Sequence, residues 1–460
     1  MDILFDWSFH GCPDTAPRQP DYEMQSDPNS SEDAWKFSQC FGDKSDTIDV
    51  AEVKFDRTGD YLASGDRAGR VVLFQRNNTK RSCEYRFYTE FQSHEPEFDY
   101  LKSLEINEKI NKIVWCRRTN DSHFLLTTND KTVKLWKVKE RQVQAVVENN
   151  MSTAQKLVST DVRLPLMLPK LVDRESVIAA TPKRIYSNAH AYHIHSISLN
   201  SDEETFLSAD DLRVNLWNVN NVEQSFNVVD MKPASIEELT EVITTAHFHP
   251  QHCNLFAFGT SKGYVKLCDM RAAALCDRHA KVFKKDEEGA HSFFSELISS
   301  VSDISFSQDG RHFVTRDYMT MKVWDLAMES HPVLTIPVHD AIKPKLCDLY
   351  ENDSIFDRFE CAFNYDGTSV LSGSYSNMLR VTTIKDNTSD VIQADKSIFR
   401  SKKASRVKMP RAQSVARLDD SLGELDFERK ILNAAAHPRE NTVAIAALSN
   451  LFVFSQIAPL

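Results

Sequence analysis

Two groups of histidines are the residues whose types and spacing could do chemistry in this chain. The groups are His190, His193 and His195, and then His247, His249, His252 and Cys253. Histidines two positions apart on a strand share one face, and zinc accepts nitrogen and sulfur ligands. No pattern of supporting carboxylates accompanies either group, and both lie where strands are expected to begin. We therefore favour structural hydrogen bonding, with zinc binding as the minor alternative.

Carboxylates recur at predicted turns between strands, at Asp66, Asp130, Asp210 and Asp317. Aspartate commonly accepts hydrogen bonds from turn N–H groups, so we interpret these residues as turn caps. No isolated pair of carboxylates suggests a general acid and base. The sequence also lacks the P-loop, H-E-x-x-H, G-x-S-x-G and G-x-G-x-x-G patterns. We expect a protein without catalytic residues, metal or cofactor.

The composition indicates a soluble protein of the cytoplasm, with the nucleus as a second compartment. The 460 residues carry a formal charge of −11, which disfavours nucleic acid as a partner. Nine cysteines form no C-x-x-C pair, as expected for reduced thiols. No apolar run approaches the roughly 18 residues of a membrane span, so we expect no membrane contact.

The elements that must position these residues are repeated strands. A unit of three alternating strands recurs seven times, and each unit has a short polar turn and then a turn containing Asp, Ser or Gly. The third strands of the units lie at 69–74, 133–136, 214–217, 265–269, 321–325, 379–381 and 451–454. A single blade cannot bury both of its faces, whereas radial repetition can. The fold class predicted is all-β, a seven-bladed β-propeller over residues 36–460.

The spacing between units leaves room for inserts, and loops often carry function. Residues 140–172 predict a projecting hairpin arm with an apolar flank, or alternatively a disordered connector. Residues 386–426 are polar and partly basic, which predicts a flexible insert, and residues 1–35 predict a disordered extension. The stretch 91–105 is open to interpretation as a loop with a partly buried aromatic pair.

A short helix is expected after the third repeat. Ser235 and Glu238 have the spacing of a capping box. Ile236, Leu239, Val242 and Ile243 would form an apolar stripe, opposite Glu237, Glu238 and Glu241. The stripe could cover the propeller rim or form a wall for a partner helix.

Several long stretches resemble the 55-kDa B-type regulatory subunits of protein phosphatase type 2A, a WD-repeat family. They include 91–106, 128–132, 188–194, 207–213, 268–279 and 346–353, and the resemblance extends from about Lys36 to Phe454. It implies a non-catalytic member of a heterotrimer with a helical-repeat scaffold (A) subunit and a catalytic (C) phosphatase subunit. The arm and the lower face would hold the scaffold.

The resemblance also implies a substrate groove on an acidic top face that recruits phosphoproteins through basic or short helical segments. By position, the groove residues would be Asp46, Arg67, Glu105, Lys109, Tyr192, His193, Asp211, Ile236, Leu239, Val242, Asp353 and Arg358. Two other classes of protein remain open from the repeats alone. One is an adaptor in a ubiquitin ligase or chromatin complex, and the other is a propeller enzyme.

Overall fold

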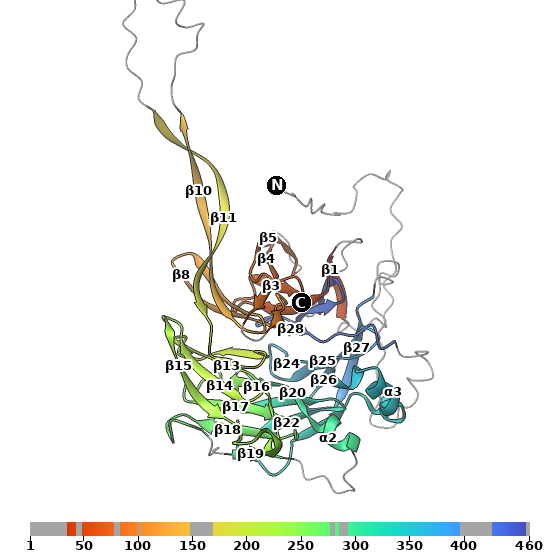
Figure 1. Ribbon diagram of the computed structural model, residues 1–460. Coiled ribbons are helices and arrows are strands. Elements are labelled where there is room, and N and C mark those ends of the chain that lie inside the picture. Colours follow the sequence, from red (N-terminus) through yellow and green to blue (C-terminus); the bar gives the residue numbers. More distant parts are fainter. Residues whose placement is uncertain are drawn as a thin grey trace, which may run out of the picture.

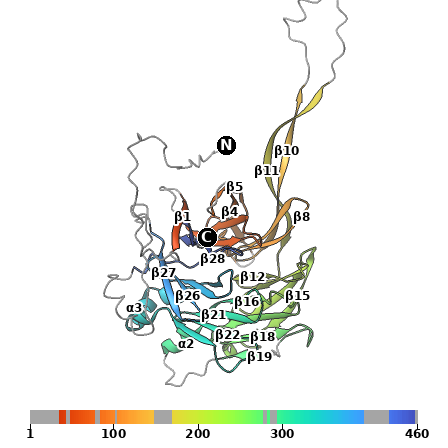
Figure 2. The same ribbon diagram turned by 180° about the vertical axis from the view of Figure 1, so that it is seen from behind.

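The computed structural model describes residues 35–42, 48–77, 83–100, 103–147, 169–276, 281–284, 293–395 and 426–456. Within these ranges the chain forms seven four-stranded antiparallel sheets arranged radially as blades (Figures 1 and 2). The first strand of each blade contacts the first strand of the next, from β28 through β2 and onward back to β28. This ring of inner strands confirms the predicted seven-bladed propeller.

The strands of the first four blades follow the predicted repeats, with a fourth, outer strand added to each. Blade 1 contains β2 (Val50–Phe55), β3 (Tyr61–Asp66), β4 (Arg70–Arg76) and β5 (Tyr85–Gln92). Blade 2 contains β8 (Lys112–Thr119), β9 (Ser122–Thr128), β10 (Val133–Val147) and β11 (Lys170–Tyr186). Blade 3 contains β12 (Ser196–Leu199), β13 (Thr205–Ala209), β14 (Arg213–Asn218) and β15 (Asn221–Asp230). Blade 4 contains β16 (Ile243–Phe248), β17 (Leu255–Thr260), β18 (Val265–Asp269) and β19 (Lys281–Phe283).

The last three blades complete the ring. Blade 5 contains β20 (Val301–Phe306), β21 (His312–Asp317), β22 (Thr320–Asp325) and β23 (Leu334–Pro337). Blade 6 contains β24 (Cys361–Phe363), β25 (Ser369–Gly373), β26 (Met378–Thr383) and β27 (Thr388–Gln393). Blade 7 joins β28 (Ala434–Ala436), β29 (Thr442–Ala447) and β30 (Asn450–Gln456) to β1 (Trp35–Phe41) from the other end of the chain.

Short elements decorate the connections between blades. The strands β6 (Glu97–Asp99) and β7 (Leu104–Ile106) form a small hairpin between blades 1 and 2. Single-turn or short helices are η1 (Ile236–Glu238), α2 (Phe293–Ser299), η2 (Asp340–Lys345), α3 (Leu346–Glu351) and η3 (Ser354–Phe356). None of the helices in the described ranges is long and apolar enough to cross a membrane.

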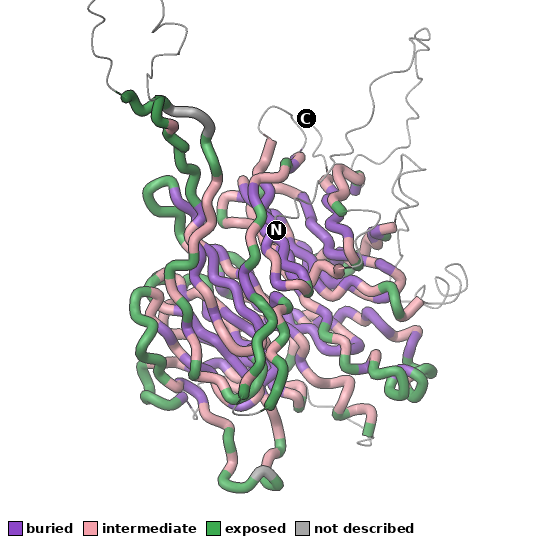
Figure 3. The backbone as a smooth tube through the Cα atoms, turned by 45° about the horizontal axis from the view of Figure 1, so that its top comes forward, coloured by how far each residue is buried: buried purple, intermediate pink, exposed green. Residues whose placement is uncertain are grey.

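Buried residues follow the strands of the propeller, whereas the arm is mostly exposed (Figure 3). The hydrophobic core consists of clusters between neighbouring blades. Between blades 2 and 3, for example, Leu126 and Val133 pack in one cluster with Phe206 and Trp217. Alternating strands supply one apolar set to each neighbour, which is why the predicted repeat pattern led to the correct fold. The eight cysteines of the described ranges are free thiols.

The projecting hairpin arm is the outer part of β10 and β11, and it extends away from the propeller (Figure 1). Glu140 pairs with Ile178 and Val147 with Lys170, so the paired part of the arm spans 140–147 and 170–178. The predicted boundary at residue 172 was therefore too early, because the polar stretch after Val172 conceals the return strand in the sequence. Residues 148–168 lie outside the described ranges.

The predicted flexible insert over 386–426 also needs a corrected start. Residues Thr388–Gln393 form β27, which pairs with β26 and completes blade 6. A polar outer strand with one face toward solvent resembles a loop in its sequence, which explains the error. Residues 396–425 and the extension 1–34 lie outside the described ranges.

Candidate functional site

The connectivity of the blades gathers the predicted site residues at one end of the propeller. Successive strands in a blade run in opposite directions, so second-to-third turns and blade-to-blade connections share one end. We call this end, formed by the connections 67–69, 93–111, 129–132, 187–195, 210–212, 231–242 and 338–360, the site end. The arm joins a third strand to a fourth strand, so it lies at the opposite end, the arm end.

Three of the four aspartates expected to cap turns do so. The Asp210 carboxylate accepts hydrogen bonds from the Leu212 and Arg213 N–H groups at 2.9 and 2.7 Å. Asp66 and Asp317 accept the corresponding bonds in blades 1 and 5. Asp130 does not cap its turn, because the Asn129 side chain accepts those bonds instead.

The Asp130 carboxylate therefore contacts other residues of the site end. Its Oδ1 accepts a hydrogen bond from Asn111 Nδ2 at 2.8 Å, and its Oδ2 lies 3.3 Å from His193 Nδ1. His193 is exposed, with 70% of its side chain accessible to solvent. Asp130 was predicted only as a turn residue. The neighbouring Asn129 can cap a turn equally well, and this was the signal in the sequence that the Asp130 carboxylate is left for other contacts.

Arg67 and Lys109 lie on the blade 1 side of this group. Arg67 forms an ion pair with Asp49, with Nη1 and Oδ2 3.4 Å apart. Lys109 lies in the segment after β7 and is accessible to solvent. Its pKa is lowered mainly by partial burial and, to a smaller extent, by the charge of Arg67. The negative charge of the Asp130 carboxylate acts to raise the pKa of Lys109. Lys109 therefore lies within electrostatic range of both Arg67 and Asp130.

Asp211, His193 and Arg358 form the adjoining group. Burial raises the pKa of the half-buried Asp211 carboxyl, while the nearby Arg358 and His193 act to lower it. Arg358 is exposed and comes from the connection before β24, whereas Asp211 comes from the turn after β13. His193 and Asp130 are in direct contact, whereas Arg67 and Asp130 act on Lys109, and Arg358 and His193 act on Asp211, through their charges. We call these six residues of the site end the charged group.

The predicted helix with an apolar stripe is wrong in extent. Only one 3-10 turn forms, η1, and its N-terminal bond joins the Glu238 N–H to the Ser235 carbonyl at 3.0 Å. Ile243 is the first residue of β16 and is fully buried in the blade core, so the stripe cannot continue on a helix. Leu239 and Val242 remain half-buried in an irregular segment before β16.

The other predicted residues are spread more widely over the site end. Glu105 is exposed on β7, Tyr192 is exposed beside His193, and Asp353 is exposed at the start of η3 with a left-handed φ of 57°. Within the described ranges, no side-chain hydrogen bond or ion pair joins these three to the charged group. Asp46 lies outside the described residues, as does the side chain of Ile236.

Both histidine groups make hydrogen bonds that support the fold, as favoured from the sequence. His190 bonds to Asp210 and Ser208, and His249 bonds to the Gly310 carbonyl and the Gln251 and His252 N–H groups. His195 contacts Ser196 Oγ, and burial lowers its pKa to about 3. Among the described residues, no group of three or more His, Cys, Asp or Glu side chains could hold a metal ion.

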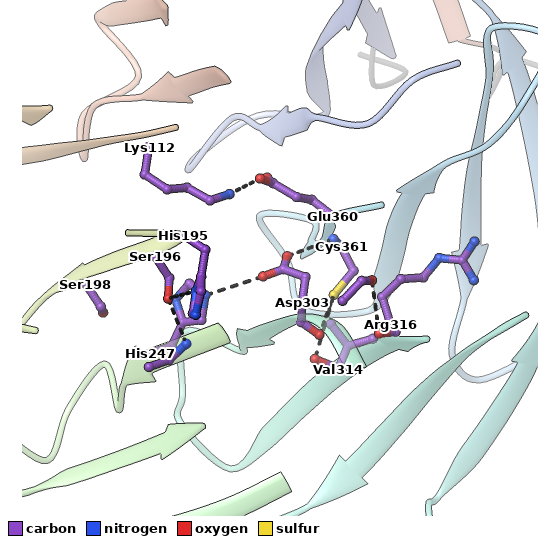
Figure 4. A network of polar contacts seen from close by, with 12 residues as sticks. Lys112, His195, Ser196, Ser198, His247, Asp303, Val314, Arg316, Glu360 and Cys361 are labelled. Atoms are coloured by element: carbon purple, nitrogen blue, oxygen red, sulfur yellow. Dashed lines mark hydrogen bonds and ion pairs between the residues drawn. The ribbon is translucent and has the colours of Figure 1, made fainter. Parts of the chain in front are cut away.

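Polar side chains on the inner strands form a further network along the propeller axis (Figure 4). Lys112 on β8 contacts Glu360, which directly precedes β24, and lies 3.4 Å from Glu52 on β2. His247 on β16 lies 3.4 Å from Asp303 on β20, which also accepts the Cys361 N–H at 3.0 Å. These contacts join separate blades to one another, so we assign them to holding the ring.

An exposed aromatic pair at the site end differs from the sequence interpretation. Phe98 and Tyr100 sit on and beside β6, with ring centroids 5.1 Å apart, and 46% and 86% of their surfaces are accessible. The alternative of a loop with a partly buried pair is therefore wrong for these two rings. Around them the same connection carries Glu95, Glu97 and Glu105, all exposed, which makes this part of the site end acidic.

The fold and site define a WD-repeat β-propeller protein. A WD domain, G-beta repeat pattern matches residues 292–325, which include β20 to β22. The chain is 54% identical to the regulatory B chain of protein phosphatase PP2A from Schizosaccharomyces pombe, over 94% of this chain and 100% of that protein. It is 48% identical to "Protein phosphatase PP2A 55 kDa regulatory subunit" of Drosophila melanogaster, over 93% of this chain and 88% of that protein.

A third relative, "Serine/threonine-protein phosphatase 2A regulatory subunit sur-6" of Caenorhabditis elegans, is 49% identical over 92% of this chain and 90% of its own. The chain belongs to the family of the 55-kDa B-type regulatory subunits of protein phosphatase PP2A. It is accordingly a regulatory and not a catalytic protein.

Proposed function

We propose that this protein selects substrates for a type 2A serine/threonine phosphatase, joining a helical-repeat scaffold by its arm and holding phosphoproteins at its site end. The observation that carries the proposal is the separation of an apolar arm and a charged group onto opposite ends of one propeller. A protein held by its arm leaves the other end free for a substrate. Tethering then raises the concentration of a phosphosite near the catalytic (C) subunit.

The exposed apolar residues of the arm support scaffold binding. Val146 and Leu171 are cross-strand partners with 59% and 66% of their surfaces exposed. Val143, Val147 and Val172 add exposed apolar surface, at 44% to 47%, on the other face of the hairpin. A two-stranded hairpin is marginal alone in water, and apolar residues on both faces suit burial against another protein.

The charges of the site end support the choice of substrate. Asp211 and Asp130 can hold basic residues that flank a phosphosite, while Leu239 and Val242 offer a half-buried apolar surface to a short helix. Arg358 and Lys109 stand beside these carboxylates and would repel a cation that bound in the wrong register. The proposed ligand is therefore a basic or amphipathic helical segment of a phosphoprotein.

The scaffold assignment can be tested with the double variant Val146→Asp/Leu171→Asp. Two charges on the exposed apolar surface of the arm should weaken binding to the purified scaffold about 100-fold or more, measured by calorimetry or surface plasmon resonance. The control is Ile185→Asp, which changes a residue with 50% exposure on the blade portion of the same strand. Equal affinities of the double variant and the unchanged protein would exclude the arm as the docking element.

A further inference from the structure

One guanidinium inside the propeller is fully buried and keeps free hydrogen-bond donors. Arg316, on β21, is the largest of the fully buried side chains in the described ranges. Its Nε and Nη1 atoms have no hydrogen-bond partner among the described residues. Its cross-strand neighbour Asp303 accepts the Cys361 N–H and contacts His247 instead, and Figure 4 shows Arg316 directed away from it. A buried cation without partners is strongly unfavourable, so its surroundings matter.

The groups that touch the Arg316 guanidinium are uncharged. Its Nη2 lies 3.4 Å from both ring nitrogens of His339, and its Cζ lies 5.5 Å from the centre of the Phe359 ring. The His339 Nδ1–H donates to the Tyr318 carbonyl at 2.6 Å, and its Nε2 accepts from the Ser374 hydroxyl at 2.9 Å. Neither ring nitrogen is left for Arg316. Burial, and then the charge of Arg316, lowers the pKa of His339 well below its usual value, so the ring is neutral.

The carboxylate whose charge acts on Arg316 is already engaged by other donors. This carboxylate belongs to Asp317, which follows Arg316 on β21. Its Oδ1 accepts the Met319 and Thr320 N–H groups, and its Oδ2 lies 2.8 Å from Lys322 Nζ. Arg316 and Lys322 therefore share one negative charge. Within the described ranges, Arg316 has no counter-ion at ion-pair distance.

A second guanidinium increases the excess of positive charge. Arg380, on β26 of the neighbouring blade 6, is partly buried, and its charge acts to lower the pKa of Arg316. Its Nη1 donates to the Pro337 carbonyl, which is a neutral acceptor. Asp340 acts on Arg380 in the opposite direction, but it is partly exposed and lies 3.2 Å from Lys343. Burial lowers the pKa of Arg316 only to about 10, so the guanidinium stays charged at neutral pH.

We propose that the Arg316 guanidinium binds a small monovalent anion, such as chloride, in the seam between blades 5 and 6. The anion accepts hydrogen bonds from the N–H groups that the described residues leave free, and it supplies the missing negative charge. Water accepts the same hydrogen bonds but leaves the positive charge uncompensated. The site is separate from the proposed contacts with substrate and scaffold, because it lies inside the propeller.

The surroundings restrict the site to a small ligand. The rings of Tyr318, Phe359 and Tyr375 have centroids 5.1 to 5.5 Å from the centre of the His339 ring, and they belong to one buried cluster. Close-packed rings leave little room for a polyatomic or hydrated ion. The anion therefore joins blade 5 to the connection 338–360, which supplies His339 and Phe359, and its binding stabilises the folded state.

The effect of chloride on unfolding tests the proposal. A ligand that binds only the folded state stabilises it. Each tenfold increase in chloride above the dissociation constant should therefore raise the ratio of folded to unfolded protein about tenfold. Denaturant titrations of the full-length protein would measure this ratio in mixtures of sodium chloride and sodium gluconate. The mixtures keep the ionic strength constant, and gluconate is too large for a buried site.

The variant Arg316→Met removes the charge and keeps a long side chain. An apolar residue in place of a buried charge is often tolerated, so we expect this variant to fold. Its stability should not depend on chloride, and in gluconate it should at least equal that of the unchanged protein. The control Arg311→Met changes a side chain that is 69% exposed, just before β21, and should keep the full chloride dependence. The same chloride dependence in both variants would overturn the proposal.

Bromide provides a readout that does not require any variant to fold. Crystals of the full-length protein grown with bromide in place of chloride should show an anomalous scattering peak within hydrogen-bonding distance of the Arg316 guanidinium. Water at that position, with no anomalous peak, would overturn the proposal even if chloride stabilised the protein through its surface.

Discussion

Asp211 is the residue whose charge matters most to the proposed site, because it is half-buried and faces two basic groups. Burial raises its pKa, whereas Arg358 and His193 favour the ionised form. Asp211→Lys would place three basic groups together and should weaken binding of a basic phosphopeptide about tenfold to 100-fold, by fluorescence anisotropy. Asp211→Asn should have a smaller effect. The control Glu329→Lys changes an exposed acid at the arm end, and equal affinities for all three variants would contradict the assignment.

Single residues also show where sequence reasoning fell short. The resemblance named Arg67, Lys109, His193, Asp211 and Arg358, but not Asp130, which lies 3.3 Å from His193 and whose charge acts on Lys109. Asp130 has the sequence setting of an ordinary turn cap, and only the geometry shows that Asn129 performs that task. His190 was equally ambiguous, because a histidine bonded to a carboxylate and a histidine bound to zinc have the same local sequence.

At the scale of elements, β1 closes the ring. It pairs with β30 over Trp35–Gln456 to Phe41–Leu451, and Phe37 meets Phe454 with ring centroids 5.8 Å apart. A chain lacking residues 1–41 would expose the β30 edge and the apolar surface beneath Trp35. We expect that chain to aggregate, or to unfold at a temperature well below that of the full-length protein. Thermal scans followed by light scattering would measure both.

A chain lacking only residues 1–34 is the matched control, because it retains the whole of β1. Its unfolding midpoint should equal that of the full-length protein within a few degrees. A 42–460 chain with the same midpoint and no aggregation would refute the closing role of β1. A marked loss of stability in the 35–460 chain would contradict the prediction that residues 1–35 are a disordered extension.

Buried strands were predicted better from the sequence than exposed ones. The three inner strands of each blade are largely buried by the neighbouring blades, several of them along their whole length, and all seven sets were predicted. Outer strands such as β15 and β27 have polar, solvent-facing residues, so their sequences resemble loops. The helix expected around Leu239 failed because Ile243 is needed in the core of blade 4. Tertiary packing overrode a local pattern of helical spacing there.

At the scale of the whole molecule, buried histidines make the propeller sensitive to acid. Burial lowers the pKa of His94 and His195 to about 3 and of His123 to about 4, and Lys134, Arg358 and Arg118 respectively add to this effect. Between these values and about 6.5 the unfolded chain binds more protons than the folded chain. Stability is therefore complete above about pH 6.5 and is lost as the pH falls.

We expect each such histidine to reduce the free energy of unfolding by up to about 1.4 kcal/mol per pH unit in this window. Denaturant titrations at pH 7, 6 and 5 would measure the slope. His123→Phe removes one titrating group while keeping a ring beside Tyr61, whose centroid is 4.1 Å away, so its slope should be shallower. An identical slope in the variant would show that His123 is not neutral and buried in the folded protein.

The blade built from both chain ends has a consequence for how the protein is made. Of the strands that the structure describes, β1 is synthesised first and its partner β30 last. At about 5–20 residues per second, β1 waits roughly 20–90 s for a partner. During synthesis the ring is open at this seam, and an unpaired strand edge is the feature that chaperones recognise and that aggregation exploits. A message truncated shortly before β30 would therefore yield a propeller that cannot close.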